Sequence, residues 1–284
     1  VAYGRVDGGI DFSGTLENPA AKVDLYLGEG RIGAYPISGV HLDGRLQNRV
    51  VTLSRFEGKQ GNGFFAAIGV VDLDGAVKAQ FSAYHVEAGL LTAALGSQVP
   101  FNGQMDMEAQ FGGTAAAPTA DASLTIVSGG QSAAFDTLSG LFQWRGEVVR
   151  VEQLLLQKSQ NGHAYKASAY GTIPIAALTS KFGDEVAADD HIDLRLSLEE
   201  GDLGLLPLLS PEIDWALGTT YGSLHIGGTL AAPSLDGAIG VKDGAVKLKD
   251  LNLPLTQLQF GLKFEEDVIT VTDGSGRMGD GTFR

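Results

Sequence analysis

The chain has 284 residues, of which 44% are hydrophobic, and a formal net charge of −14. The hydrophobic content excludes a wholly disordered chain, and the excess of acidic over basic residues, 34 against 20, argues against a surface that binds nucleic acid. Because the chain contains no cysteine, disulfide frameworks and thiolate metal sites are excluded as well. No window approaches the roughly 18 consecutive apolar residues that a membrane-spanning helix needs.

Residues 22–33 read KVDLYLGEGRIG, which predicts a strand followed by glycines. Val23, Leu25 and Leu27 occupy alternate positions, so they share one face of that strand. The spacing Gly28-x-Gly30-x-x-Gly33 matches a dinucleotide-binding fingerprint, but that site needs a helix next, and AYPISG follows instead. We therefore interpret the glycines as a hairpin turn and expect no cofactor.

Two segments lose the period of two and predict short helices, 84–95 and 201–215. Pro207 and Pro211 would keep the second helix brief. The polar run 183–191 predicts a loop whose carboxylates could offer oxygen ligands to Ca²⁺. These residues lack the spacing of a calcium loop, so we expect a solvated loop and no metal site; they are Asp184, Glu185, Asp189 and Asp190.

Further strands show the same alternation of apolar and polar residues. QMDMEAQF at 104–111 places Met105, Met107 and Phe111 on one face, and Leu124 and Ile126 repeat the pattern shortly after. Later runs, HIDLRLSL at 191–198 and LQFGLKF at 258–264, do the same for Leu194, Leu196, Leu198, Phe260, Leu262 and Phe264. Such strands predict an antiparallel sheet with one apolar face and one polar face.

A repeated motif, G-T-[LA]-x-x-P, begins at Gly14, Gly113 and Gly228. Turn-forming dipeptides follow each copy at 62–63, 161–162 and 280–281, and Asp243-Gly244 predicts a further hairpin turn. The spacing indicates a repeat of roughly a hundred residues built from several hairpins. We therefore predict one continuous repetitive segment over 1–284, with repeats starting near 14, 113 and 228 and variable connectors at 78–103 and 176–218.

Catalytic motifs are missing from the sequence, which contains no G-x-S-x-G, P-loop or H-E-x-x-H. The five histidines show no metal-ligand spacing and are interpreted as solvated strand residues. We expect a protein that is not an enzyme and has no catalytic residues. The apolar face itself is compatible with the core of a closed β-sandwich or the interior of a barrel, and with the lipid-facing side of an outer-membrane barrel. The presence of only two tryptophans argues against the outer-membrane barrel.

Three stretches carry a resemblance to a known family: FSGTLENPAAKVDLYLGEG, FGGTAAAPTADASLTIVSGG and IGGTLAAPSLDGAIGVKDGAVKL. Together with GKQGNGFFAAIGVVDLDG, and with the connector-like stretch DLRLSLEEGDLGLLPLLSPEIDWALGTTYGSLHIGGTL, they resemble the repeat of the TamB branch of the AsmA-like superfamily. No N-terminal membrane anchor and no C-terminal segment for an outer-membrane partner are recognised in the sequence. The resemblance therefore implies a middle or C-terminal fragment of a longer protein.

That resemblance implies an all-β fold with little helix, an elongated β-sheet curled like a taco into a groove with an apolar interior. It implies a segment of a bridge-like lipid transfer protein in the periplasm of a diderm bacterium, anchored in full length in the inner membrane. Its partners would be phospholipid acyl chains and an outer-membrane barrel assembly protein of the Omp85 type. The alternatives are a scaffold or chaperone in outer-membrane protein assembly that pairs strands with its clients, and an adhesin or passenger β domain.

The residues expected to line the groove are the apolar members of the alternating strands. They are Val23, Leu25, Leu27, Met105, Met107, Phe111, Leu124, Ile126, Leu194, Leu196, Leu198, Phe260, Leu262 and Phe264.

Overall fold

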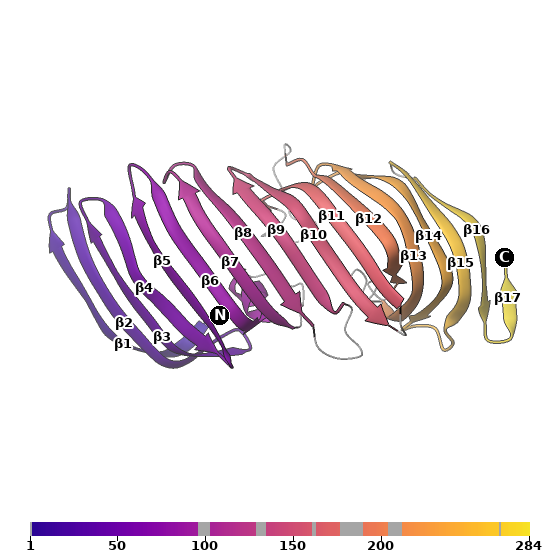
Figure 1. The fold of residues 1–284 in the computed structure, drawn as a ribbon, viewed down its shortest axis with the longest axis horizontal. Coiled ribbons are helices and arrows are strands. Elements are labelled where there is room, and N and C mark those ends of the chain that lie inside the picture. Colours follow the sequence, from indigo (N-terminus) through magenta and orange to yellow (C-terminus); the bar gives the residue numbers. More distant parts are fainter. Residues whose placement is uncertain are drawn as a thin grey trace. The chain divides into compact units, whose positions relative to one another are not determined.

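The computed structural model describes residues 2–95, 103–128, 135–160, 163–176, 190–203, 212–266 and 268–284. Nearly all of these residues belong to β-strands, and strands that are consecutive in the sequence pair antiparallel in a 17-stranded sheet that is not closed (Figure 1). This confirms the predicted all-β fold with little helix. A closed β-sandwich is not formed by the described strands, because they belong to one sheet.

Two compact units divide the chain, and each is described by itself. Unit 1 comprises residues 1–129 and 140–150, and unit 2 comprises residues 130–139 and 151–284. Unit 1 contains β1 (Ala2–Gly14), β2 (Pro19–Ile32), β3 (Tyr35–Gln47), β4 (Val50–Gln60), β5 (Gly63–Asp72), β6 (Val77–Glu87), α1 (Ala88–Leu95), β7 (Gln104–Gly113) and β8 (Pro118–Val127). The next two strands have residues in both units; they are β9 (Thr137–Arg145) and β10 (Val148–Gln160).

Unit 2 has the same hairpin architecture. Its elements are β11 (His163–Pro174), β12 (Asp193–Asp202), β13 (Ile213–Gly228), β14 (Pro233–Leu248), β15 (Leu255–Glu266), β16 (Val268–Met278) and β17 (Gly281–Phe283). The predicted connectors therefore contain regular structure: 78–103 includes most of β6 and all of α1, and 176–218 includes β12 and the start of β13.

The repeated motif forms the same hairpin loop three times, between β1 and β2, β7 and β8, and β13 and β14. In the middle copy Gly113 pairs with Pro118, and the Ala117 amide donates to the Thr114 hydroxyl oxygen at 3.1 Å. Gly113 has a φ of 76°, and a Cβ there would lie 2.4 Å from the Ala117 carbonyl oxygen. The glycine is thus required both by its left-handed backbone and by the close approach of the chain.

Glycines inside the strands bend the sheet. Gly8, Gly171, Gly222 and Gly237 have φ between 133° and 143°, and a Cβ on any of them would lie within 2.3 Å of a carbonyl oxygen of the neighbouring strand. All four lie opposite large apolar partners: Gly8 pairs with Leu25, Gly171 with Leu194, Gly222 with Ile239 and Gly237 with Leu224. Such glycine kinks are a known device for curving and coiling strands.

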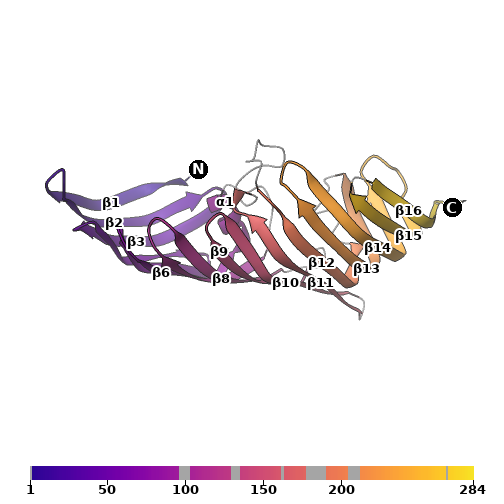
Figure 2. The same cartoon turned by 90° about the horizontal axis from the view of Figure 1, so that it is seen from above.

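The contacts of helix α1 show that the sheet of unit 1 is curved. The helix directly follows β6 and also contacts β2. Tyr35, at the start of β3, packs against the helix so closely that a Cβ on Gly89 would lie 1.8 Å from the Tyr35 hydroxyl oxygen. In the order of strand pairing, β2 lies four strands from β6, about 19 Å away in a flat sheet. The sheet of unit 1 therefore bends around the helix at this end, as Figure 2 shows.

The hairpin turns predicted from glycine-containing dipeptides are only partly found in the structure. The dipeptide at 62–63 marks a hairpin whose loop is Gly61 and Asn62. The dipeptide at 280–281 marks a hairpin whose loop is Gly279 and Asp280. The dipeptide at 161–162 lies outside the described residues. The turn predicted at Asp243-Gly244 is wrong, because both residues lie inside β14 at a bulge, where Asp243 has a φ of 50°. Of the three glycines at 28–33, only Gly33 lies in a turn, and the other two belong to β2.

The helix predicted over 84–95 forms over 88–95, because 84–87 continue β6. In the segment 201–215, residues 201–202 belong to β12 and 213–215 to β13. Residues 204–211, with both prolines, lie outside the described residues. The same holds for the predicted loop at 183–191 apart from its last two residues.

Candidate functional site

The apolar face of unit 1 is built by the register of its strands, because directly opposed residues of an antiparallel pair share a face. Successive pairings can be followed from β1 to β8 without meeting a polar side chain. One such row is Gly8, Leu25, Leu42, Phe56, Ala67, Phe81, Ala109 and Ala122. A parallel row is Ile10, Val23, Gly44, Leu53, Gly69, Ala79, Phe111 and Ala120.

Unit 2 has an apolar face of the same kind. One row there is Ala169, Leu196, Leu224, Gly237, Phe264 and Ile269, and another is Ala167, Leu198, Gly222, Ile239, Leu262 and Val271. Near its middle Leu203, Ala216 and Val241 form a small buried cluster against which Phe260 packs. Thr220, the partner of Val241, is a polar side chain buried on this face.

The predicted lining residues are gathered on these two faces. Val23, Leu25, Leu27, Met105, Met107, Phe111, Leu124 and Ile126 share the apolar face of unit 1. Leu194, Leu196, Leu198, Phe260, Leu262 and Phe264 share that of unit 2.

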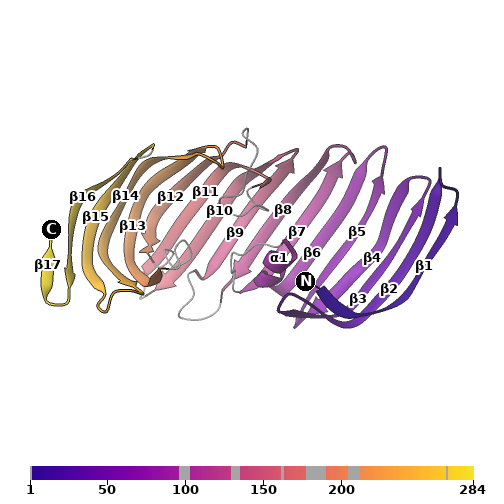
Figure 3. The same cartoon turned by 180° about the vertical axis from the view of Figure 1, so that it is seen from behind.

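The apolar face of unit 1 is most deeply buried at one end, although Val77, Ala109 and Ala120 elsewhere on it are buried as well. Val86, Met105 and Ile126 are 1 to 2% exposed, and Figure 3 shows the nearby helix α1 lying on this side of the sheet. Away from this end, Leu25, Leu42, Met107 and similar side chains are only half-buried, and on β1 Ile10 and Phe12 are 48% and 80% exposed. A sealed core would bury all of them, so the face is open over much of its area.

The opposite face of the sheet carries the charged residues, which pair across strands. The His41 ring lies 2.9 Å from Asp24 Oδ1 and 3.2 Å from the Arg55 guanidinium, and His225 lies 2.8 Å from Asp193 Oδ1. No group of three or more metal-ligating side chains occurs within the described ranges, and Asp184, Glu185 and Asp189 lie outside them.

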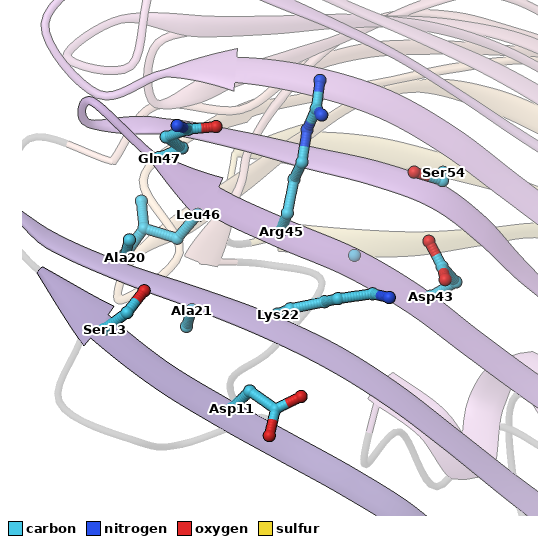
Figure 4. A pocket seen from close by; sticks show the side chains of 11 residues that line it. Asp11, Ser13, Ala20, Ala21, Lys22, Asp43, Arg45, Leu46, Gln47 and Ser54 are labelled. Carbon is cyan, nitrogen blue, oxygen red and sulfur yellow. The ribbon is translucent and has the colours of Figure 1, made fainter.

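The polar face of unit 1 contains a depression of about 460 Å³ (Figure 4). Asp11, Lys22 and Arg45 point into it from β1, β2 and β3, with Asp43 beside them. These side chains are solvated and of mixed charge, and none of them is buried. The depression therefore lacks the desolvated, convergent polar groups that a catalytic site needs.

Sequence reasoning missed about half of the apolar face, including β3, β4, β5 and β6. Val40, Leu42 and Leu46 alternate as regularly as the predicted strands and could have been found by the same signal. In β4 a bulge between Leu53 and Phe56 hides the pattern, because the extra residue shifts the alternation by one.

The described helices include none long and apolar enough to cross a membrane. Comparison with family models, with curated proteins and with solved structures finds no match to this chain.

Proposed function

We propose that the apolar faces carry the acyl chains of phospholipids, and that the chain is a non-enzymatic segment of a periplasmic protein that moves lipid between the two membranes of a diderm bacterium. The observation that supports this most is the uncovered apolar face, whose rows of Leu, Val, Ile, Phe, Ala and Gly continue over eight strands of unit 1. The resemblance to the TamB repeat supplies the compartment and the class of ligand.

The energetics favour a face of this kind over a specific pocket. Two acyl chains with roughly 30 CH₂ groups at about 0.8 kcal/mol each would cost on the order of 25 kcal/mol in water. Apolar contacts are non-directional, so neighbouring positions along a row have nearly equal free energy. A lipid can then move from one position to the next without a high barrier.

The proposal is tested by polar substitutions on the apolar face. We expect Leu25→Asn and Leu196→Asn to lower the phospholipid extracted by organic solvent from the purified protein at least several-fold. Tyr26→Asn and Arg195→Asn, on the opposite face of the same strands, are matched controls and should leave the lipid content unchanged. Circular dichroism confirms that each variant remains β-rich. A purified protein free of phospholipid, or equal losses in both pairs, would refute the proposal.

A second candidate is a scaffold that pairs strands with client proteins, together with an Omp85-type partner. It is favoured by β1, which among the described residues pairs with β2 alone and leaves its other edge free. Free edges of this length can template another strand. Prolines placed in β1 where the amide points away from β2 should abolish client binding and leave the lipid content unchanged.

A further inference from the structure

Strand β5 differs from its neighbours, because it is apolar on both faces. Phe65, Ala67, Gly69 and Val71 belong to the apolar face of unit 1 described above. The alternate residues Phe64, Ala66, Ile68 and Val70 lie on the polar face; Phe64, Ile68 and Val70 are 49%, 54% and 42% exposed. These four residues are called the outer strip. A strand that is apolar on both faces is typical of burial on both sides.

The outer strip lies between two depressions of the polar face. One, of about 330 Å³, is lined by Ala66, Ile68, Tyr84 and Glu108, and the other, of about 580 Å³, by Thr52, Ile68, Val70 and Lys78. Ile68 lines both, so it forms a ridge between them. The strip runs over seven residues of β5, which is about 20 Å.

Two lysines flank the strip at its two ends. Lys59 pairs with Phe64, and Lys78 pairs with Val70. Neither ammonium group forms an ion pair within the described part of the chain. Of the nearby carboxylates, Glu57 lies 3.9 Å from the Arg55 guanidinium, Glu108 accepts a hydrogen bond from the neutral Tyr84 hydroxyl, and Asp72, two residues beyond Val70, accepts one from the Asp74 amide. A carboxylate of a partner could therefore pair with the ammonium group at either end of the strip.

We propose that the outer strip binds an amphipathic helix of a partner protein, with its apolar side along β5 and acidic residues near both ends. A helix fits better than an extended segment, because a strand laid on the face of a sheet leaves its backbone groups unpaired, whereas a helix satisfies its own. About 13 residues of helix span 20 Å, which places the acidic residues roughly 13 positions apart, opposite Lys59 and Lys78.

The test uses a synthetic helical peptide of 18 residues with a leucine stripe, glutamates near both ends and an alanine-rich opposite side. A second peptide carries lysines in place of the glutamates. Shifts of the Ile68 and Val70 methyl NMR signals report binding at the strip. We expect the acidic peptide to shift these signals and to bind at least tenfold more tightly than the basic one. Ile68→Ser and the pair Lys59→Glu with Lys78→Glu should each weaken it at least fivefold.

Tyr26→Ser is the matched control, since Tyr26 is 49% exposed on the same polar face of unit 1. It should leave peptide binding unchanged. Equal binding of the two peptides, absence of methyl shifts, or binding of anionic phospholipid vesicles that Ile68→Ser abolishes would overturn the proposal. So would a dimer in sedimentation that Ile68→Ser dissociates, because a second copy would then occupy the strip. None of these outcomes depends on lipid in the apolar face.

Discussion

At the scale of single residues, the glycine of the repeated motif is the most sharply constrained position. At Gly14, Gly113 and Gly228 alike, φ is positive and an added Cβ would lie 2.4 Å from a carbonyl oxygen. The recurrence of one loop geometry explains why this short motif is conserved between the copies while the strands around it vary in sequence.

Gly113→Ala should destabilise unit 1 by about 1–3 kcal/mol, because an alanine in this conformation strains its own backbone and meets the Ala117 carbonyl. Urea denaturation followed by circular dichroism measures the change. Gly9→Ala is the control, since a Cβ at Gly9 has no heavy atom within 4 Å, and it should be neutral or slightly stabilising. Equal midpoints for the two variants would contradict this account of the loop.

The ion pair between Arg49 and Asp74 joins two turns of unit 1. Arg49 donates through Nε and through a terminal nitrogen of its guanidinium to the two carboxylate oxygens, at 2.5 and 2.8 Å, and this hydrogen bonding lowers the pKa of Asp74. A carboxylate whose pKa is lowered by folding stabilises the protein at neutral pH, and this contribution is lost as the pH falls below the unfolded value of about 3.9 and through the folded one.

Asp74→Asn should therefore lower the urea midpoint slightly at pH 7, and the difference from the parent chain should shrink below about pH 3.9. The effect is small because both side chains are solvated. Asp11→Asn, which removes a carboxylate without an ion pair in the described part of the chain, is the control. A difference at pH 7 that persists unchanged in acid would show that the substitution acts through something other than this charge.

At the scale of elements, the strands could be predicted from alternation wherever the pairing is regular, as in β2, β7 and β12. The sequence could not reveal the bulges in β4 and β14, because a bulge is fixed by the partner strand as well as by its own residues. The same reason explains the wrong turn at Asp243-Gly244: a dipeptide that favours positive φ serves a bulge as well as a turn. The predicted start of α1 was too early, because residues 84–87 extend β6 by pairing with β7, and this pairing is not visible in the local sequence.

Helix α1 is the element whose removal should matter most to the apolar face. It has eight residues, with no acidic residue in its first turn and no basic residue in its last, so it is held mainly by packing. Its buried residues Ala88 and Leu90 lie at the end of the sheet where Val86 and Met105 are buried. The helix and a bound acyl chain would therefore compete for the same apolar surface.

Gly89→Leu should displace α1, because the new side chain would occupy the position of the Tyr35 hydroxyl. We expect stronger binding of a fluorescent fatty acid, several-fold in affinity, since apolar surface is uncovered. Gly9→Leu, on the opposite face of β1, controls for added hydrophobicity. Unchanged binding in Gly89→Leu, with a folded sheet by circular dichroism, would show that α1 does not cover the surface that binds the acyl chain.

At the scale of the whole molecule, the fold class followed from the sequence, because period-two alternation over many strands has few solutions. Whether the apolar face was open or sealed did not follow, since an apolar strand face looks the same in a groove and in a sandwich core. The structure decides this through exposure. In unit 1 Phe12 is 80% exposed, whereas Val86 and Met105 near α1 are buried, and in unit 2 Ile269 is 58% exposed. The outer strip escaped prediction because β5 is apolar on both faces, so its sequence GFFAAIGVVD shows no period of two.

The central claim, that acyl chains lie on the apolar faces, is tested most directly by a scan with a photoreactive amino acid along β7 and β12. One position at a time is replaced from Gln104 to Phe111 and from Asp193 to Leu198, and crosslinking to radiolabelled phospholipid is measured. The account predicts crosslinks with a period of two, at Met105, Met107, Ala109 and Phe111 and at Leu194, Leu196 and Leu198, and none at the positions between. Crosslinks without that period, or none at all, would contradict it.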